Sequence, residues 1–161
     1  MSTKRTLEQI TPFLGRDLRL DYSLSGGFFE DADLATRKRL EQPAAPRDLD
    51  VADGLDAMEQ AIANRLKTRQ GELASLGHPT YGSRHHELMG EPNVDRTRNL
   101  VKLYVLQALR DEPRIAKVLE VSVTPEHTPP RDTVRIALTV ELTGAPTPLN
   151  LIVPFSFEVT P

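Results

Sequence analysis

Two stretches in the last third of the chain alternate regularly between apolar and polar residues. TVRIALTVEL, at residues 133–142, carries its apolar side chains at even positions, and LNLIVPFSFEVT, at 149–160, carries them at odd positions. A period of two is typical of a β-strand with one buried face. Because the turn-rich TGAPTP separates these stretches and the apolar VLEVSV precedes them, we predict an antiparallel meander packed on helices.

Two earlier stretches repeat their apolar residues at helical spacing instead. In residues 53–69 an apolar stripe is followed by basic residues, which predicts a helix that Asp53 caps and Gly71 ends. In residues 94–111 apolar side chains surround most of the circumference, so we predict a buried central helix. The fold class that follows is α+β, with two main helices on a small antiparallel sheet.

The first part of the chain lacks any sustained period. Leu18, Leu20 and Tyr22 alternate briefly, which predicts a short strand, and QPAAPRD is typical of a linker. We therefore expect an extended N-terminal arm and linker at residues 1–50 and a core domain at 51–161. The arm carries too many aromatic residues for a solvated tail, so we expect it to pack on its own domain or on a partner.

Pro154 interrupts the last predicted strand. Proline has no N–H group to donate to a neighbouring strand, so this strand is predicted to lie at an edge of the sheet or to bulge there. The alternation points Pro154 away from the apolar face, where it would blunt the edge against unwanted pairing.

Composition and charge mainly exclude classes of function. The chain has 161 residues, enough for one domain with a buried core, and its net charge of -3 gives no reason to expect a nucleic-acid binder. Cysteine is absent, which excludes disulfides and thiolate chemistry. Because the chain shows no signal-peptide core and no apolar run of about 18 residues, we expect synthesis in the cytoplasm and no membrane insertion.

The histidines His78, His85 and His86, beside Glu87, are the candidates for a metal site. A helical zinc site needs two histidines one turn apart, and that spacing is absent. We therefore predict loop histidines on a polar surface, with no metal and no cofactor.

The candidates for a glycosidase pair are Glu72 or Glu87 with Asp95. Such a pair must be held across a sugar-binding cleft. Aromatic residues, which usually line such clefts, make up only 5% of the chain, and tryptophan is absent. The motifs of serine hydrolases and of nucleotide-binding loops are also absent, so we predict surface acids and no enzyme.

The tripeptide Glu112-Pro113-Arg114 ends the second predicted helix. In one interpretation Pro113 breaks the helix and both charges face water. In the other, Arg114 reaches a carboxylate or backbone carbonyls and fixes the corner between helix and strand, because its planar group makes several directed hydrogen bonds. The residues by themselves leave both interpretations open.

Four segments, in this order and spacing, resemble a known family. They are GLDAMEQAIANRLKTRQGEL, GHPTYGS, ELMGEPN and DEPRIAKVLEVSV, followed by the two alternating strands, and the resemblance covers about residues 50–159. The chain is similar to the baseplate wedge and sheath-initiator proteins of contractile-tailed phages and contractile injection systems. PFLGRDL, at 12–18, is also similar to the family's N-terminal entry, whereas the rest of the arm departs from it.

The resemblance implies a structural protein rather than an enzyme. It implies about six copies around a baseplate, where the small sheet accepts extended strands from the first ring of sheath subunits and so initiates sheath assembly. The implied partners are sheath subunits, other wedge proteins and tube or hub proteins, without nucleic acid. A stand-alone adaptor that binds a regulatory protein through the same sheet is the alternative, and a peptidoglycan-acting enzyme is a third class.

The resemblance also implies which residues carry the function. Glu112, Pro113 and Arg114 correspond to the family's core motif, with a wedge contact. The loop motif is Gly71, Glu72, Pro79, Tyr81 and Gly82. The sheet that accepts the sheath strand is represented by Val134, Ile136, Leu138, Leu151, Val153, Pro154, Phe155 and Phe157.

Overall fold

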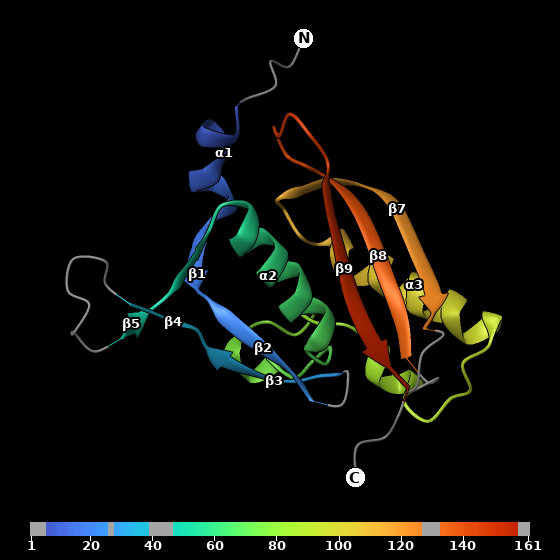
Figure 1. Cartoon of the computed structure of the whole chain (residues 1–161). Coiled ribbons are helices and arrows are strands. Elements are labelled where there is room, and N and C mark those ends of the chain that lie inside the picture. The colour runs from blue at the N-terminus through green and yellow to red at the C-terminus, as the bar shows by residue number, and fades with distance from the viewer. Residues whose placement is uncertain (1–5, 26–27, 39–46, 127–132, 158–161) are drawn as a thin grey trace.

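The computed structural model describes residues 6–25, 28–38, 47–126 and 133–157 (Figure 1). Its elements, with η marking short 3-10 helices, are in chain order α1 (Leu7–Leu14), β1 (Arg16–Leu18), β2 (Leu20–Ser25), β3 (Phe28–Leu34), β4 (Thr36–Arg37), β5 (Asp48–Leu49), β6 (Val51–Asp53), α2 (Leu55–Lys67), η1 (Ala74–Leu76), η2 (His85–Leu88), α3 (Asp95–Arg110), β7 (Ile115–Pro125), β8 (Thr133–Leu142) and β9 (Leu149–Ser156).

The predicted meander is confirmed as a three-stranded antiparallel sheet in the order β7-β8-β9. Val134 pairs with Phe155 and Ile136 with Val153, so the apolar positions of neighbouring strands share one face. That face is buried in the core, while the other face of the sheet carries the polar positions. The predicted α+β class is confirmed.

Helix α3 covers the buried face of the sheet, mainly along β7 (Figure 1). The expectation that this helix is buried nearly all round is wrong, because Leu103 is 45% exposed and Leu106 is 39% exposed. Only one side of α3 meets the sheet, and no other described layer covers its outer side. None of the described helices is long and apolar enough to cross a membrane.

Helix α2 is confirmed, but its ends differ from the prediction. Asp53 belongs to strand β6, and the residue before the helix is Gly54, whose φ of 58° a glycine adopts readily. The helix ends before Thr68, whose hydroxyl donates to the carbonyl of Asn64 at 2.8 Å, and not at Gly71. These are local differences that leave the apolar stripe of the helix in place.

The N-terminal segment packs on its own chain. Helix α1 was not predicted, because Pro12 lies inside it and its apolar residues show no clear helical period in the sequence. Ile10 and Leu14 of this helix are fully buried in the same core as α3 and the sheet. The predicted strand around Leu18 and Leu20 corresponds to β1 and β2, and β1 pairs antiparallel with β6.

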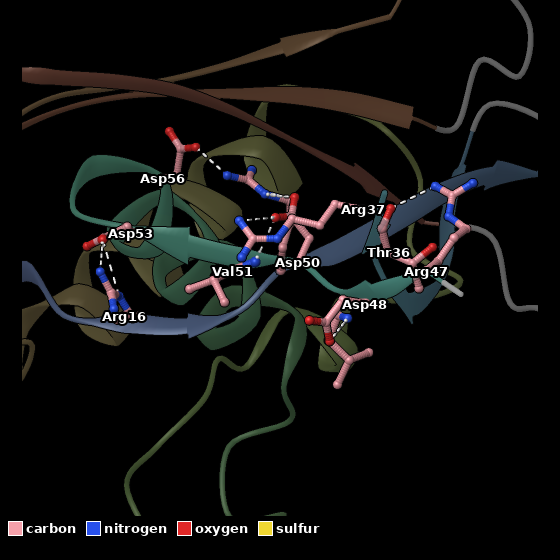
Figure 2. Close-up of polar contacts among 11 residues, drawn as sticks. Arg16, Thr36, Arg37, Arg47, Asp48, Asp50, Val51, Asp53 and Asp56 are labelled. Carbon is pink, nitrogen blue, oxygen red and sulfur yellow. Dashed lines mark hydrogen bonds and ion pairs between the residues drawn. The ribbon is translucent and has the colours of Figure 1, made fainter. Parts of the chain in front are cut away.

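A set of ion pairs accompanies this strand pairing (Figure 2). Arg16 reaches Asp53 of β6 at 2.6 Å, and Arg19 reaches Asp56 in the first turn of α2 at 2.7 Å, so these arginines tie the N-terminal segment to β6 and α2. These side chains are largely exposed to water, where an ion pair typically contributes about 1 kcal/mol or less. Burial of α1 therefore does more than these charges to hold the segment in place.

We expect Leu14→Ala to lower the free energy of unfolding by about 3 kcal/mol, because it opens a cavity beneath α1. Phe13→Ala is the matched control, since Phe13 lies next in the same helix but is 47% exposed. Urea unfolding of both variants measures the difference. Equal losses would show that α1 is not part of the cooperative core.

Candidate functional site

The corner between α3 and β7 is built around the carboxylate of Glu112. This side chain is only 7% exposed and accepts a hydrogen bond from Nε of Arg114 at 2.6 Å. The backbone N–H of Arg114 donates to the same oxygen at 3.3 Å. Helix α3 ends at Arg110, and Pro113 prevents its continuation because proline has no N–H for a further helical turn. The acid and the arginine are therefore folded back onto each other.

A second arginine, Arg65 of α2, approaches the other carboxylate oxygen of Glu112. Its Nη2 lies 3.2 Å from that oxygen, and its side chain is only 11% exposed. Its guanidinium also lies over the ring of Tyr81, 4.5 Å from the ring centroid, in cation–π geometry. Glu112 is thus held between two cations from two different elements.

These neighbours decide the charge of Glu112. Burial by itself raises the pKa of the carboxyl group, but the hydrogen bond from Arg114 and the positive charges of Arg114 and Arg65 outweigh it. The pKa of Glu112 therefore lies below its ordinary value, and the group is ionised at neutral pH. The pKa of Arg114 is raised, mainly by its hydrogen bond to Glu112, so its positive charge is retained as well.

Arg114 also connects the corner to the N-terminal segment. Its Nη1 donates to the backbone carbonyl of Leu14, the last residue of α1, at 2.9 Å. Carbonyls at the end of a helix have no partner within the helix, so this bond satisfies one of them. We call Arg65, Tyr81, Glu112 and Arg114 the corner cluster; it joins α1, α2, the loop after α2, and the turn after α3.

The structure decides between the two interpretations of the tripeptide. Arg114 binds both a carboxylate and a backbone carbonyl, as the second interpretation required, and neither Glu112 nor Arg114 simply faces water. Arg65 was not identified from the sequence, where it counted only as a basic residue near the end of a helix. The sequence did place Arg65 next to Leu66, at the edge of the apolar stripe, and this position could have indicated that the Arg65 side chain is partly buried.

The loop motif is brought to the corner cluster through Tyr81. The other motif residues act locally: Glu72 accepts a hydrogen bond from the backbone N–H of Arg69 at 3.1 Å, and Pro79 is exposed. Gly71 has a φ of 87°, and no atom lies within 4 Å of the position that a Cβ would occupy. The loop and core motifs, distant in the sequence, therefore meet at the Arg65 guanidinium.

Gly82 allows the loop to return to the end of α2. Its φ is 104°, and a Cβ atom there would lie 2.7 Å from the carbonyl oxygen of Thr68. The next residue, Ser83, donates its N–H to that same oxygen at 2.8 Å. A left-handed conformation and a close backbone approach coincide at Gly82, which only glycine accommodates without strain.

The prediction that the histidines lie on a polar surface is wrong for His85, which is buried. Its Nδ1 lies 2.7 Å from the hydroxyl of Ser83, and its Nε2 lies 3.3 Å from the carbonyl of Val101. Burial lowers the pKa of His85, so the neutral ring is favoured. Within the described residues, no group of three potential ligands could hold a metal ion.

The candidate glycosidase carboxylates are each engaged by neighbouring residues. Glu87 forms an ion pair with Arg84 at 2.7 Å, and the hydroxyl of Tyr104 donates to it at 3.2 Å. The hydrogen bond from Arg84 lowers the pKa of Glu87, the opposite of what a general acid at neutral pH requires. Asp95 pairs with Arg98 within α3.

The residues proposed to accept a sheath strand fall into two groups. Val134, Ile136 and Leu138 lie in β8, which is paired on both sides, so their backbones have no room for a further strand. The others lie in β9 or directly after it, at an edge of the sheet: Leu151, Val153, Pro154, Phe155 and Phe157. The prediction that Pro154 belongs to an edge strand is confirmed, and β8 and β9 pair there without a bulge.

Comparison with known proteins identifies the family. The profile of the family described as baseplate wedge protein gp25 matches residues 52–147. The chain belongs to the baseplate wedge family. The matched region includes α2, α3, β7 and β8, and therefore every residue of the corner cluster, while α1 and β9 lie outside it. Membership assigns the chain a structural role in a phage-tail baseplate.

A similar fold is found in a crystal structure of another protein. It is that of a protein from Geobacter sulfurreducens with a provisional description as a tail lysozyme, 25% identical to this chain with a TM-score of 0.54. The similarity covers 64% of this chain and 90% of that one. No curated protein matches the chain.

We expect Glu112→Gln to lower the free energy of unfolding by about 3 kcal/mol. The amide keeps the shape of the side chain but leaves two arginines without their shared anion in a mostly buried place. Thermal or urea unfolding measures the effect, with Glu91→Gln at an exposed position as the control. A loss no larger than that of the control would show that the corner cluster does not hold the fold.

We expect Gly82→Ala to cost about 2 kcal/mol more than Gly77→Ala, because only the first places a methyl group against backbone atoms. The comparison is matched, since Gly77 also has a positive φ, 87°, but nothing lies within 4 Å of the Cβ position there. Urea unfolding of the two variants measures the difference. If both lose the same stability, backbone strain accounts for the whole effect and the close approach is unimportant.

Proposed function

We propose that this wedge protein links the baseplate to the first ring of sheath subunits and initiates sheath assembly by accepting their extended segments as added strands. The observation that carries the proposal is the small antiparallel sheet with β9 at its edge. An edge strand presents unpaired N–H and C=O groups at regular spacing, and a strand added there gains main-chain hydrogen bonds and a defined register.

The corner cluster supports this proposal by making the sheet a rigid platform. Sheath contraction loads any added strand, so the receiving sheet must not shift against the helices. Glu112 and its two arginines connect the start of β7 to α2 and to the end of α1. The corner therefore transmits force from the sheet into the whole core rather than into one strand.

We place the wedge contact at the outer side of the same corner. Pro113 is exposed and the Arg114 side chain is 25% exposed, so part of the core motif is accessible to a neighbour even though Glu112 is buried. The motif would then have two roles, an internal one through Glu112 and an external one through Pro113 and the outer edge of Arg114. About six copies, one per wedge, and further contacts to tube or hub proteins complete this proposal.

The proposed role is not catalytic. A glycosidase needs one carboxyl group with a raised pKa opposite a second one. The ion pair of Glu87 with Arg84, which lowers the pKa of Glu87, supports a non-catalytic role. Release of soluble fragments from purified cell wall by the wild-type protein, lost in Glu72→Gln or Glu87→Gln, would contradict this part of the proposal.

Mixing the purified protein with its sheath subunit tests the main proposal. We expect direct binding and a shorter lag before sheath polymerisation, followed by light scattering and electron microscopy. A sheath subunit trimmed of its extended terminal segments is the control and should neither bind nor respond. The proposal fails if the intact sheath subunit does not bind and the protein is missing from the baseplate of intact particles.

A further inference from the structure

Among the described strands, β7 and β9 each pair only with β8, although α2 and β3 also lie against parts of β9. The register shows which backbone groups each edge presents. The N–H of Glu126, directly after β7, donates to the carbonyl of Thr133 at 3.0 Å, so Thr133 directs its backbone groups towards β7. Backbone direction alternates along an antiparallel strand, so Arg135 and Thr139 also face β7. Their partners in β9 are therefore not hydrogen-bonded to them.

This alternation identifies the outward groups of β9. Pro154 pairs in register with Arg135, Ile152 with Ala137, and Asn150 with Thr139. Since those β8 residues face β7, the backbone groups of these three β9 residues face away from the sheet. No hydrogen bond from the described part of the chain reaches the outward N–H groups of Asn150 and Ile152. An extended segment is the ligand that matches such a row of donors and acceptors.

A groove follows this outward edge. One hollow, of about 770 Å³, lies between residues 150–154 of β9 and a wall that includes Leu20, Gln60 and Ala63. A second, of about 1010 Å³, continues along Pro154, Phe155 and Ser156. Tyr22, Lys67 and Pro154 line both hollows, so the two meet there. Figure 1 shows α2 beside β9, on the side away from β8, with β2 beyond α2.

The edge of β7 offers a less regular template. Its pairing with β8 shifts register twice, between Ile115 and Lys117 and between Val118 and Glu120, so Ala116 and Leu119 are extra residues. Bulges of this kind bend the strand and break the even spacing of its outward groups. The β9 edge has no such shift over its whole pairing with β8.

Pro154 leaves one hydrogen-bond donor missing along the β9 edge, and Lys67 lines the same two hollows as Pro154. A strand added there would have one carbonyl opposite Pro154 without a donor, because proline has no N–H. The ammonium of Lys67 lies over the ring of Tyr22, 4.0 Å from its centroid, in the same middle section of the groove. Burial lowers the pKa of Lys67 to about 8, so at neutral pH the group is mostly a charged donor.

The geometry points to β9, not β7, as the edge that receives the extended sheath segment, with Lys67 donating to the carbonyl that Pro154 cannot satisfy. This inference rests on the proposed function and adds to it the edge and the residue. The added strand continues the sheet, with alternate side chains directed to the mixed polar and apolar wall that includes Leu20 and Ala63 and to the outer face beside Ile152.

Disulfide trapping tests the choice of edge. The chain has no cysteine, so Ile152→Cys and Glu120→Cys each introduce a single thiol, one on each edge strand at an exposed position. Paired with single cysteines along the extended segments of the sheath subunit, Ile152→Cys should form a disulfide and Glu120→Cys should not, because the bond needs Cα atoms within about 7 Å.

The outcome separates the two proposals. Trapping from Glu120→Cys, alone or as efficiently as from Ile152→Cys, would overturn the choice of β9 while leaving strand addition intact. Absence of any sheath binding by the wild-type protein would instead overturn the proposed function, on which this inference depends.

Affinity measurements test Lys67. We expect Lys67→Met to weaken sheath binding about tenfold, the usual loss for one hydrogen bond from a charged group, while Lys67→Arg keeps most of the affinity. Lys102→Met, on the exposed side of α3, is the control and should bind like the wild type. Melting temperatures of all variants exclude an effect through folding. Affinity equal to that of the control would overturn the assignment of Lys67.

Discussion

The fold depends on one buried carboxylate that two arginines share. Glu112 lies in a turn, where a charged side chain is ordinarily solvated, yet it is almost completely enclosed. An enclosed charge is tolerated only when it is paired and hydrogen-bonded. Arg65 and Arg114 supply both conditions from opposite sides, and in doing so they fix the positions of the elements that carry them.

The two arginines that pair with Glu112 also hold α1 and the loop after α2 in place. Arg114, which directly precedes β7, donates a hydrogen bond to the last residue of α1. Helix α1 is therefore fixed to the start of the sheet. Arg65 contacts Tyr81, so the long loop after α2 is fixed at the same point. With these elements in place, β2 and α2 lie beside the free edge of β9 and give it a groove rather than a flat solvent boundary.

Several elements could be predicted because their physics is local. The alternation in β8 and β9 and the apolar stripe of α2 each depend on periodicity along a few turns or pleats, and each was located correctly. The limits of this reasoning appear where partners come from elsewhere in the chain. Helix α1 was not predicted because its apolar residues show only a weak helical period. The helix is stabilised instead by packing of Ile10 and Leu14 against core residues that are distant in the sequence.

The sequence by itself determined the α+β class and the order of the main elements, and it marked Pro154 and the turn at Glu112 as positions with two possible interpretations each. Composition and short periods carry that information, since each depends on residues close together in the chain. Only the tertiary structure decided that β9 is an unbulged edge strand, that Arg65 completes the corner cluster and that His85 is buried. It also decided that Leu103 and Leu106 are exposed and that Lys67 and Pro154 line the same groove. Each of these depends on which segments meet in space, and no local pattern encodes that meeting.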